Sequence, residues 1–145
     1  MTGPPTPAVT YQSTLDGVSA DDLEGFFEGW PSPPSSRTLL RVLHGSDYVV
    51  VARAGGSQVV GMIAAITDDV LTAFVTLLEV RPGHRNHGIG SELVGRVRDH
   101  FVDLYGVDVL CDAELVPFYE RLGFRPAAAA SIRRYDRQAG VDGPP

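Results

Sequence analysis

The hydrophobic pattern in the central part of the chain consists of extended apolar runs separated by turn residues. The runs 47–53, 58–67 and 70–80 predict three consecutive strands, joined by turns at 54–57 and 68–69. The second run is apolar on both faces, which is typical of a strand in a sheet that is covered on both sides. A β-meander is therefore expected at the centre of the fold.

A helical spacing of apolar residues is found on either side of these strands. Before them, Ser35 or Ser36 is expected to cap a helix that runs to about His44. After them, apolar residues recur on one face and predict a long amphipathic helix. Those residues are Ile89, Leu93, Val97, Phe101 and Leu104.

The two ends of the chain add shorter elements. At the N-terminal end, residues 9–14 predict a strand, and Ser19 is expected to cap a short helix. The apolar face of that helix would be Leu23, Phe26 and Phe27. The Pro-rich stretch 29–34 cannot be helical and predicts a loop of defined shape.

At the C-terminal end, residues 107–111 predict a strand, and 114–122 a helix that ends at Gly123. Residues 127–135 should supply one or two last strands.

The order of these elements is that of a mixed α/β protein. A chain of 145 residues is the size of one domain with a sizeable core. Its 43% hydrophobic and 21% charged residues are ordinary globular composition. We therefore expect a single domain over 1–145, with flexible ends at 1–8 and 138–145.

The most informative motif lies at 85–90, between the third central strand and the long helix, and reads Arg-Asn-His-Gly-Ile-Gly. A loop of this kind turns several backbone N–H groups toward one point at a helix N-terminus, where the helix dipole also favours negative charge. Glycines at 88 and 90 let the backbone approach a ligand without a Cβ. A pyrophosphate is the predicted ligand.

The residues around the glycines narrow the choice of ligand. A P-loop would need Lys and Ser or Thr after Gly88, but Ile89 and Gly90 follow it. A dinucleotide fingerprint would need a small residue where Leu93 stands. The remaining pattern, R-x-x-G-x-G, resembles the acyl-CoA loop of the GNAT superfamily of N-acetyltransferases.

A second segment strengthens this resemblance. Residues 112–124 read DAELVPFYERLGF and resemble the family's second signature, with matches at 118–119 and 123–124. The resemblance covers about 70–124. It implies a central mixed sheet, mostly antiparallel, with a splayed parallel pair at the acyl-CoA site and helices on both faces.

The resemblance also implies acetyl-CoA as cosubstrate, with Leu78 and Val80 pairing through their backbone with pantetheine. Arg85 either contacts phosphate or is a solvated loop arginine. Asp112 stands where the family often has asparagine, and an ionised carboxylate cannot donate a hydrogen bond there. The full set of expected cofactor-binding residues is Leu78, Val80, Arg85, Asn86, His87, Gly88, Ile89, Gly90, Ser91 and Asp112.

Two side chains are the expected catalytic groups. By resemblance, Tyr119 lies beside the CoA sulfur and would act as the acid, with a core tyrosine as the alternative. Glu79 is the expected base, because partial burial in an apolar strand would raise its pKa. It could instead pair with an arginine, and a water chain could act as the base. Cys111 is expected to be inert core rather than an acyl carrier.

By resemblance, the N-terminal helices form one wall of the acceptor cleft. Phe26, Phe27 and Trp30 are the candidate contacts, and simple packing of Trp30 is the alternative. The acceptor would carry an amine and could be a small molecule or a peptide.

The composition of the chain limits the kinds of partner that it is expected to bind. A net charge of −6, with no lysine, argues against nucleic acid. No run is long enough to span a membrane, and no signal peptide is recognisable, so a cytoplasmic monomer or homodimer is expected. His84 and His87 are not spaced with metal ligands, so no metal is expected. The rival functions are an acyl-CoA-binding regulatory module or pseudoenzyme, and a structural interaction domain.

Overall fold

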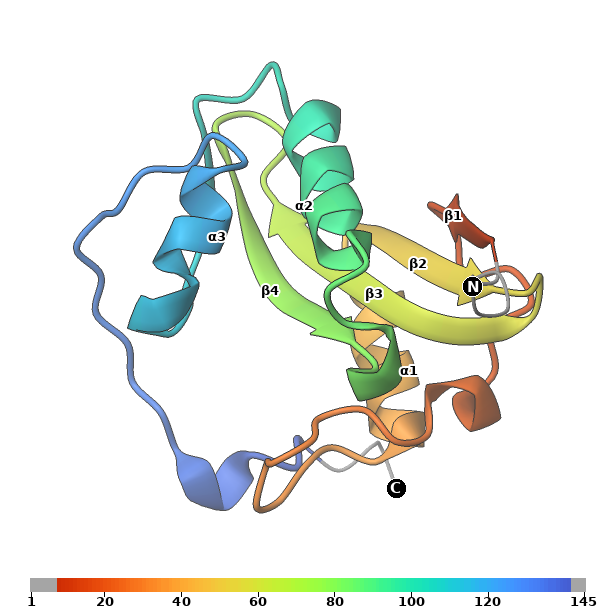
Figure 1. Ribbon diagram of the computed structural model, residues 1–145. Coiled ribbons are helices and arrows are strands. Elements are labelled where there is room, and N and C mark those ends of the chain that lie inside the picture. Colours follow the sequence, from red (N-terminus) through yellow and green to blue (C-terminus); the bar gives the residue numbers. More distant parts are fainter. Residues whose placement is uncertain (1–7, 142–145) are drawn as a thin grey trace.

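The computed structural model describes residues 8–141 and contains a five-stranded sheet in the order β1-β2-β3-β4-β5 (Figure 1). Neighbouring strands are antiparallel except β4 and β5, which are parallel. This confirms the predicted mixed α/β class. The strands are β1 (Val9–Gln12), β2 (Tyr48–Ala54), β3 (Gln58–Thr67), β4 (Thr72–Val80) and β5 (Gly106–Val109).

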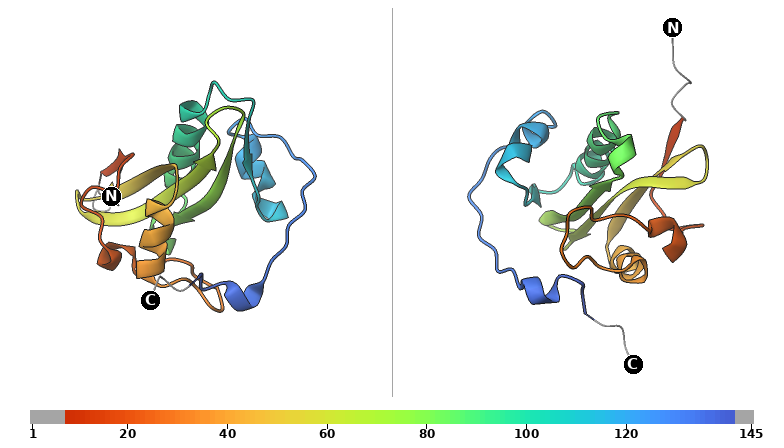
Figure 2. Two further views of the ribbon diagram at one scale, coloured as in Figure 1. Left: turned by 180° about the vertical axis from the view of Figure 1, so that it is seen from behind. Right: turned by 60° about the horizontal axis from the view of Figure 1, so that its bottom comes forward.

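Helices cover both faces of the sheet, as the two-sided apolar character of β3 predicts (Figures 1 and 2). Helix α2 (Ile89–His100) packs on one face and α1 (Ser36–His44), capped by Ser35, on the other. Gly61 of β3 is needed under α2. A Cβ there would lie 3.1 Å from the Glu79 carbonyl oxygen and 3.2 Å from Ile89 Cγ2.

The helix predicted after Ser19 is shorter than the sequence indicated. The structure has a single 3-10 turn, η1 (Ala20–Leu23), closed by a capping box between Ser19 and Asp22. Gly25 then has φ 84° and Phe27 φ 65°, so the backbone cannot continue as a helix. Phe27 is nevertheless buried in the core on the α1 face.

The parallel pair separates early. Hydrogen-bonded pairing of β4 with β5 runs only from Thr72 opposite Gly106 to Val75 opposite Val109. β4 continues to Val80 on its pairing with β3 alone. The second half of β4 therefore has one open backbone edge, which agrees with the splay that the family resemblance implies.

Beyond β5 the chain is mostly irregular. The predicted helix over 114–122 is a 3-10 turn, η3 (Ala113–Leu115), followed by the short α3 (Val116–Glu120). The strand predicted over 127–135 is wrong for the single chain. That segment is extended, pairs with no strand, and leads to η4 (Tyr135–Arg137).

The residues after η4 return to α1. Arg41 Nη1 donates to the Val141 carbonyl at 3.0 Å, and the Ser32 N–H donates to Gln138 Oε1 at 3.1 Å. Of the ends expected to be flexible, 1–8 and 138–145, residues 1–7 and 142–145 lie outside the described residues. Within the part of the chain that is described, no helix is long and apolar enough to cross a membrane.

Arg81, directly after β4, fastens the N-terminal segment to the sheet. Its guanidinium donates to the carbonyls of Val59 at 2.6 Å, Glu24 at 2.6 Å and Asp22 at 3.0 Å. The same group lies 4.2 Å from the centre of the Phe26 ring. One side chain thus satisfies acceptors from two distant parts of the chain.

Arg81→Lys should lower the free energy of unfolding by about 1–3 kcal/mol, because one ammonium cannot reach three divergent carbonyls and leaves acceptors unpaired. Urea unfolding followed by circular dichroism measures the change. Arg37→Lys is the matched control, since Arg37 is an exposed helix residue with no hydrogen bond from its side chain to a described residue. Equal stability of the two variants would contradict the role given to Arg81.

Candidate active site

The open edge of β4 begins at a β-bulge. Leu77 lies opposite Ala64 and Val75 opposite Ala65, so Thr76 is the extra residue. The Arg81 N–H donates to the Val60 carbonyl across the sheet. Because backbone groups alternate in direction along a strand, those of Leu78 and Val80 face the open edge. The backbone expected to hold pantetheine is therefore directed into the splay.

The loop after β4 presents unpaired donors at the start of α2. Asn86 and Gly88 have φ values of 65° and 84°, the left-handed conformation that favours glycine. Among the described residues, no backbone hydrogen bond uses the N–H groups of 86–91, and the first helical bond is Glu92 N–H to the Gly88 carbonyl, 3.0 Å. These donors fit a phosphate group at a helix N-terminus.

Gly90 keeps this loop close to α3. A Cβ at this position would lie 3.5 Å from the Phe118 ring and 4.0 Å from Val80 Cγ2. The glycine loop, the end of β4 and α3 therefore meet at one place, although they are separated in the sequence by about thirty residues. Ser91 lies in the first turn of the helix, half-buried.

The Arg85 side chain points away from the loop's donors. Its Nε donates to the Val80 carbonyl at 3.2 Å, and its Nη1 forms an exposed ion pair with Glu28, also at 3.2 Å. An exposed pair of this kind contributes little to stability. The side chains of His87 and Asn86 are exposed.

Glu79 is half-buried and forms no ion pair with another described residue, so the alternative role as an arginine's structural partner gains no support. Burial raises the pKa of its carboxyl above the usual value, and the nearby Arg85 charge offsets part of that shift. The side chains of Leu77 and Glu79 lie on the α1 face of β4, because successive strand residues alternate.

Tyr119 lies on the opposite face. It is 6% exposed and belongs to the core cluster against which Leu78 and Val80 also pack. Its ring lies between those of Phe118 and Phe124, with centroid distances of 4.9 and 5.5 Å. Burial, assisted by the neighbouring Cys111, raises the pKa of its phenol to about 12. The hydroxyl makes no hydrogen bond with another described residue, and it is neutral at physiological pH.

Cys111 is exposed, so the expectation of a buried core cysteine is wrong. It follows the end of β5, where the chain leaves the sheet. Partial desolvation and the charges of Asp112 and Glu114 raise the pKa of its thiol, which is therefore protonated at neutral pH. Such a thiol is a poor nucleophile. Asp112 is the exposed residue before η3.

A cleft of about 660 Å³ opens beside Glu79 on the α1 face. It is lined by Thr76–Glu79 of β4 and by Trp30, Leu110, residues 132–135, Arg137 and Gln138. Of the three aromatic residues expected to contact the acceptor, only Trp30 reaches this cleft. Phe27 is core, and Phe26 lies under the Arg81 guanidinium.

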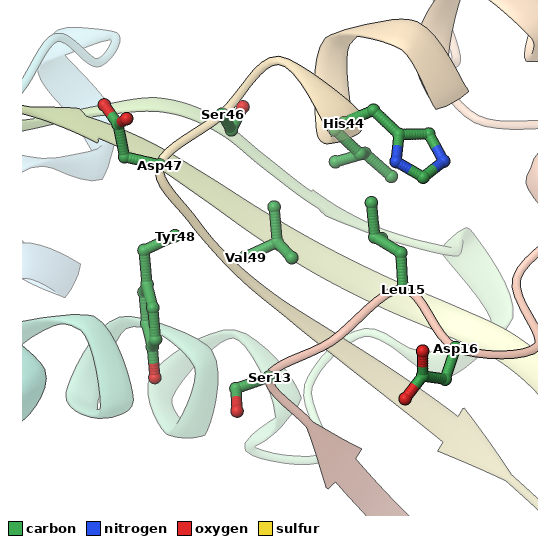
Figure 3. A pocket seen from close by; sticks show the side chains of 9 residues that line it. Ser13, Leu15, Asp16, His44, Ser46, Asp47, Tyr48 and Val49 are labelled. Carbon is green, nitrogen blue, oxygen red and sulfur yellow. The ribbon is translucent and has the colours of Figure 1, made fainter.

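A second, smaller hollow of about 380 Å³ lies between α1 and the start of β2 (Figure 3). It is lined by Ser13, Leu15, Asp16, Leu43, His44 and residues 46–49, and it shares no residue with the cleft beside Glu79. The described residues contain no cluster of three or more His, Cys, Asp or Glu that could hold a metal ion.

The comparisons with known proteins agree with this geometry. The sequence model of the acetyltransferase (GNAT) family matches residues 15–124, and the chain therefore belongs to this family. Members generally use acetyl-CoA as cosubstrate and act on amine-bearing acceptors.

Among solved structures, the chain is 49% identical to a protein from Deinococcus radiodurans R1 that is assigned as an acetyltransferase. The TM-score is 0.90, and the match covers 93% of this chain and 94% of the other. It is 26% identical to a GNAT family acetyltransferase of Streptococcus pneumoniae TIGR4, with a TM-score of 0.70 and coverage of 88% and 99%. At 15% identity, a glucosamine-6-phosphate N-acetyltransferase of Arabidopsis thaliana shares the fold, with a TM-score of 0.66 and coverage of 89% and 99%.

Gly88→Val should weaken CoA binding at least 10-fold, because a β-branched residue at φ 84° costs about 1–3 kcal/mol and turns the loop's N–H groups away from their common point. Titration calorimetry with CoA measures the loss. Gly83→Val is the matched control, since a Cβ at Gly83 meets nothing within 4 Å and φ there is not positive. Unchanged affinity for Gly88→Val would remove the loop from the cofactor site.

Proposed function

We propose that this protein is an acetyl-CoA-dependent N-acetyltransferase that transfers an acetyl group to an amine by direct attack in a ternary complex. The observation that carries the proposal is the meeting of three features at the end of β4: the unpaired donors of 86–91, the open backbone edge, and a half-buried carboxylate facing a cleft. Each is a requirement of this reaction.

The donor side is the face of the sheet that carries α2 and α3. Bound acetyl-CoA would supply an activated acetyl thioester. The backbone N–H groups of 86–91 would hold its pyrophosphate, and the outward backbone groups of Leu78 and Val80 would pair with the pantetheine amides. A backbone N–H at this edge would also stabilise negative charge on the acetyl oxygen during attack.

The acceptor side is the cleft on the α1 face. Glu79 would take a proton from the ammonium of the acceptor, so that a neutral amine attacks the acetyl carbon. Burial raises the pKa of its carboxyl, which makes the Glu79 carboxylate a stronger base than an exposed glutamate. Trp30 would border the acceptor, and this cleft could take a small molecule or the end of a peptide.

Tyr119 would act on the leaving sulfur from the opposite face. With a pKa of about 12, its phenol is a weaker acid than an ordinary thiol of about 8.5, so complete proton transfer to the thiolate is uphill. Its contribution is therefore a hydrogen bond from the phenol O–H to the sulfur as negative charge develops. A neutral, desolvated phenol suits that role.

The experiment that tests this function is thiol release from acetyl-CoA across a panel of amines and amino-terminal peptides. Transfer to at least one amine supports the proposal. Stabilisation by CoA in thermal shift without transfer to any amine would favour the rival reading, a regulatory module that binds acyl-CoA. No response to CoA would contradict both.

Glu79→Gln should lower kcat/KM for the amine about 10²-fold at neutral pH, with partial recovery at higher pH as free amine accumulates. Its stability should not fall. Because folding raises the carboxyl pKa, the folded state binds more protons, and stability decreases as pH rises through that pKa. The amide removes this penalty, so the melting temperature at pH 7–8 should stay equal or rise. Reduced stability with normal turnover would show that Glu79 is structural.

Tyr119→Phe should lower kcat and kcat/KM together by about 10- to 100-fold, the value of a hydrogen bond to a charged group, with little change in KM for acetyl-CoA. A thioester with a more acidic thiol should recover most of the rate. Single-turnover rates and melting curves from one preparation separate this from a packing role, in which the melting temperature falls and the rate survives. Wild-type turnover would remove Tyr119 from the mechanism.

A further inference from the structure

The cleft beside Glu79 is lined by more positive than negative charge. Arg133, Arg134 and Arg137 line it together with Glu79, and no other charged residue among those described does. Asp136, which lies between two of these arginines in the sequence, is not part of the lining. The chain as a whole has the opposite balance, with a net charge of −6. The excess of positive charge is thus a local property of this cleft.

The guanidinium groups of these three arginines have no partner within the described part of the chain. None of them forms an ion pair with a carboxylate there. The arginines whose side chains do donate hydrogen bonds to described residues are Arg41, Arg53, Arg81, Arg85, Arg96 and Arg98. One unpaired arginine on a surface is ordinary. Three that line the same cleft present a set of free donors to whatever enters it.

The segment that carries these arginines is attached to the α1 side of the sheet. After α3 the chain passes outside the sheet and returns to α1, where η4 lies (Figure 1). Arg134 directly precedes η4, and Arg137 is its last residue. The next residue, Gln138, accepts a hydrogen bond from the Ser32 N–H at 3.1 Å. The arginines therefore lie on the face that carries Glu79, and not on the α2 face, where the phosphates of CoA are expected.

Most of the uncharged polar side chains of the cleft are donors as well. The carboxamide oxygen of Gln138 already accepts from a backbone N–H, which leaves its NH₂ group. The Trp30 indole can only donate, and the Tyr135 hydroxyl is 73% exposed and able to donate. Thr76 is the exception, because its hydroxyl proton is used on a backbone carbonyl. Apart from Glu79, the cleft is thus suited to a group that accepts hydrogen bonds.

We propose that the acceptor of this enzyme is a small amine that also carries an acidic group, a carboxylate or a phosphate. The acceptor class rests on the proposed acetyl transfer, because Glu79 is the group that receives the proton of the amine. The acidic group binds Arg133, Arg134 and Arg137, since a planar guanidinium can donate two parallel hydrogen bonds to a carboxylate or a phosphate. The volume of about 660 Å³ is that of a small-molecule site.

The charges of the cleft select against an amine that has no acidic group. At neutral pH such a molecule is a cation, which three guanidiniums repel and only one carboxylate attracts. An amine with an acidic group offers each sign of charge a partner, with its ammonium at Glu79 and its anion at the arginines. The two signs come from different elements, β4 and the segment that ends in η4. The same charges therefore also orient the acceptor.

Two pairs of amines that differ in the acidic group test the proposal: β-alanine against β-alaninamide, and phosphoethanolamine against ethanolamine. Thiol release from acetyl-CoA gives kcat/KM for each. The wild type should favour the acidic member of at least one pair by about 10-fold or more, and the pair that shows this distinguishes a carboxylate from a phosphate. The preference should decrease with added salt. Equal rates within both pairs would overturn the acceptor class while leaving the acetyl transfer in place.

A variant that combines Arg133→Gln, Arg134→Gln and Arg137→Gln tests the arginines themselves. Its kcat/KM for the acidic acceptor should fall by about 10-fold or more, while that for the neutral partner should change little or rise. Lysine at the same three positions should recover part of the loss, because the charge is kept. Arg125→Gln is the matched control, since Arg125 is an exposed arginine of the same segment that does not line the cleft. A raised KM for acetyl-CoA with unchanged acceptor preference would show that the arginines bind the cofactor, and would overturn the proposal.

Binding without transfer can be followed through Trp30, which is the single tryptophan of the chain and lines the cleft. With CoA in place of acetyl-CoA, the change in Trp30 fluorescence on adding each amine reports occupancy alone. The wild type should bind the acidic member of a pair more tightly, and the triple Gln variant should lose that difference. Equal binding within both pairs would contradict the acceptor class. Selective binding of the acidic amine without any transfer from acetyl-CoA would instead contradict the N-acetyltransferase function.

Discussion

The short pairing between β4 and β5 is the constraint on which the rest of the site depends. The two strands share hydrogen bonds over four residue pairs and then separate at the bulge residue Thr76. A sheet that stayed paired would have used the backbone of Leu78 and Val80 internally. Because it does not, the N–H and carbonyl groups of Leu78 and the N–H group of Val80 face an open gap, while the Val80 carbonyl accepts from Arg85 Nε. The loop at 86–91 presents its own unpaired N–H groups at the end of the same strand.

The two candidate catalytic groups, Glu79 and Tyr119, lie on opposite faces of β4. Glu79 and Leu78 are neighbours that point to opposite faces of β4, and Tyr119 packs on the face of Leu78. Burial acts on both groups but has different consequences. It keeps the phenol of Tyr119 protonated, with a pKa of about 12, and makes the Glu79 carboxylate a stronger base. A hydrogen-bond donor and a proton acceptor are thus held on either side of one gap.

The sequence by itself determined the strands, the two long helices and the glycine loop, because these depend on local periodicity, capping and the residues in one turn. It did not determine the extent of the first helix, since the positive φ values at Gly25 and Phe27 are fixed by tertiary packing. The sequence also did not predict that Phe26 lies under the Arg81 guanidinium. Nor did it predict that Trp30 would be the one residue of the three candidate aromatics to line the cleft. The strand predicted over 127–135 failed for the same reason. Propensity shows that a segment can extend, but only the arrangement of the other strands decides whether a partner lies within reach.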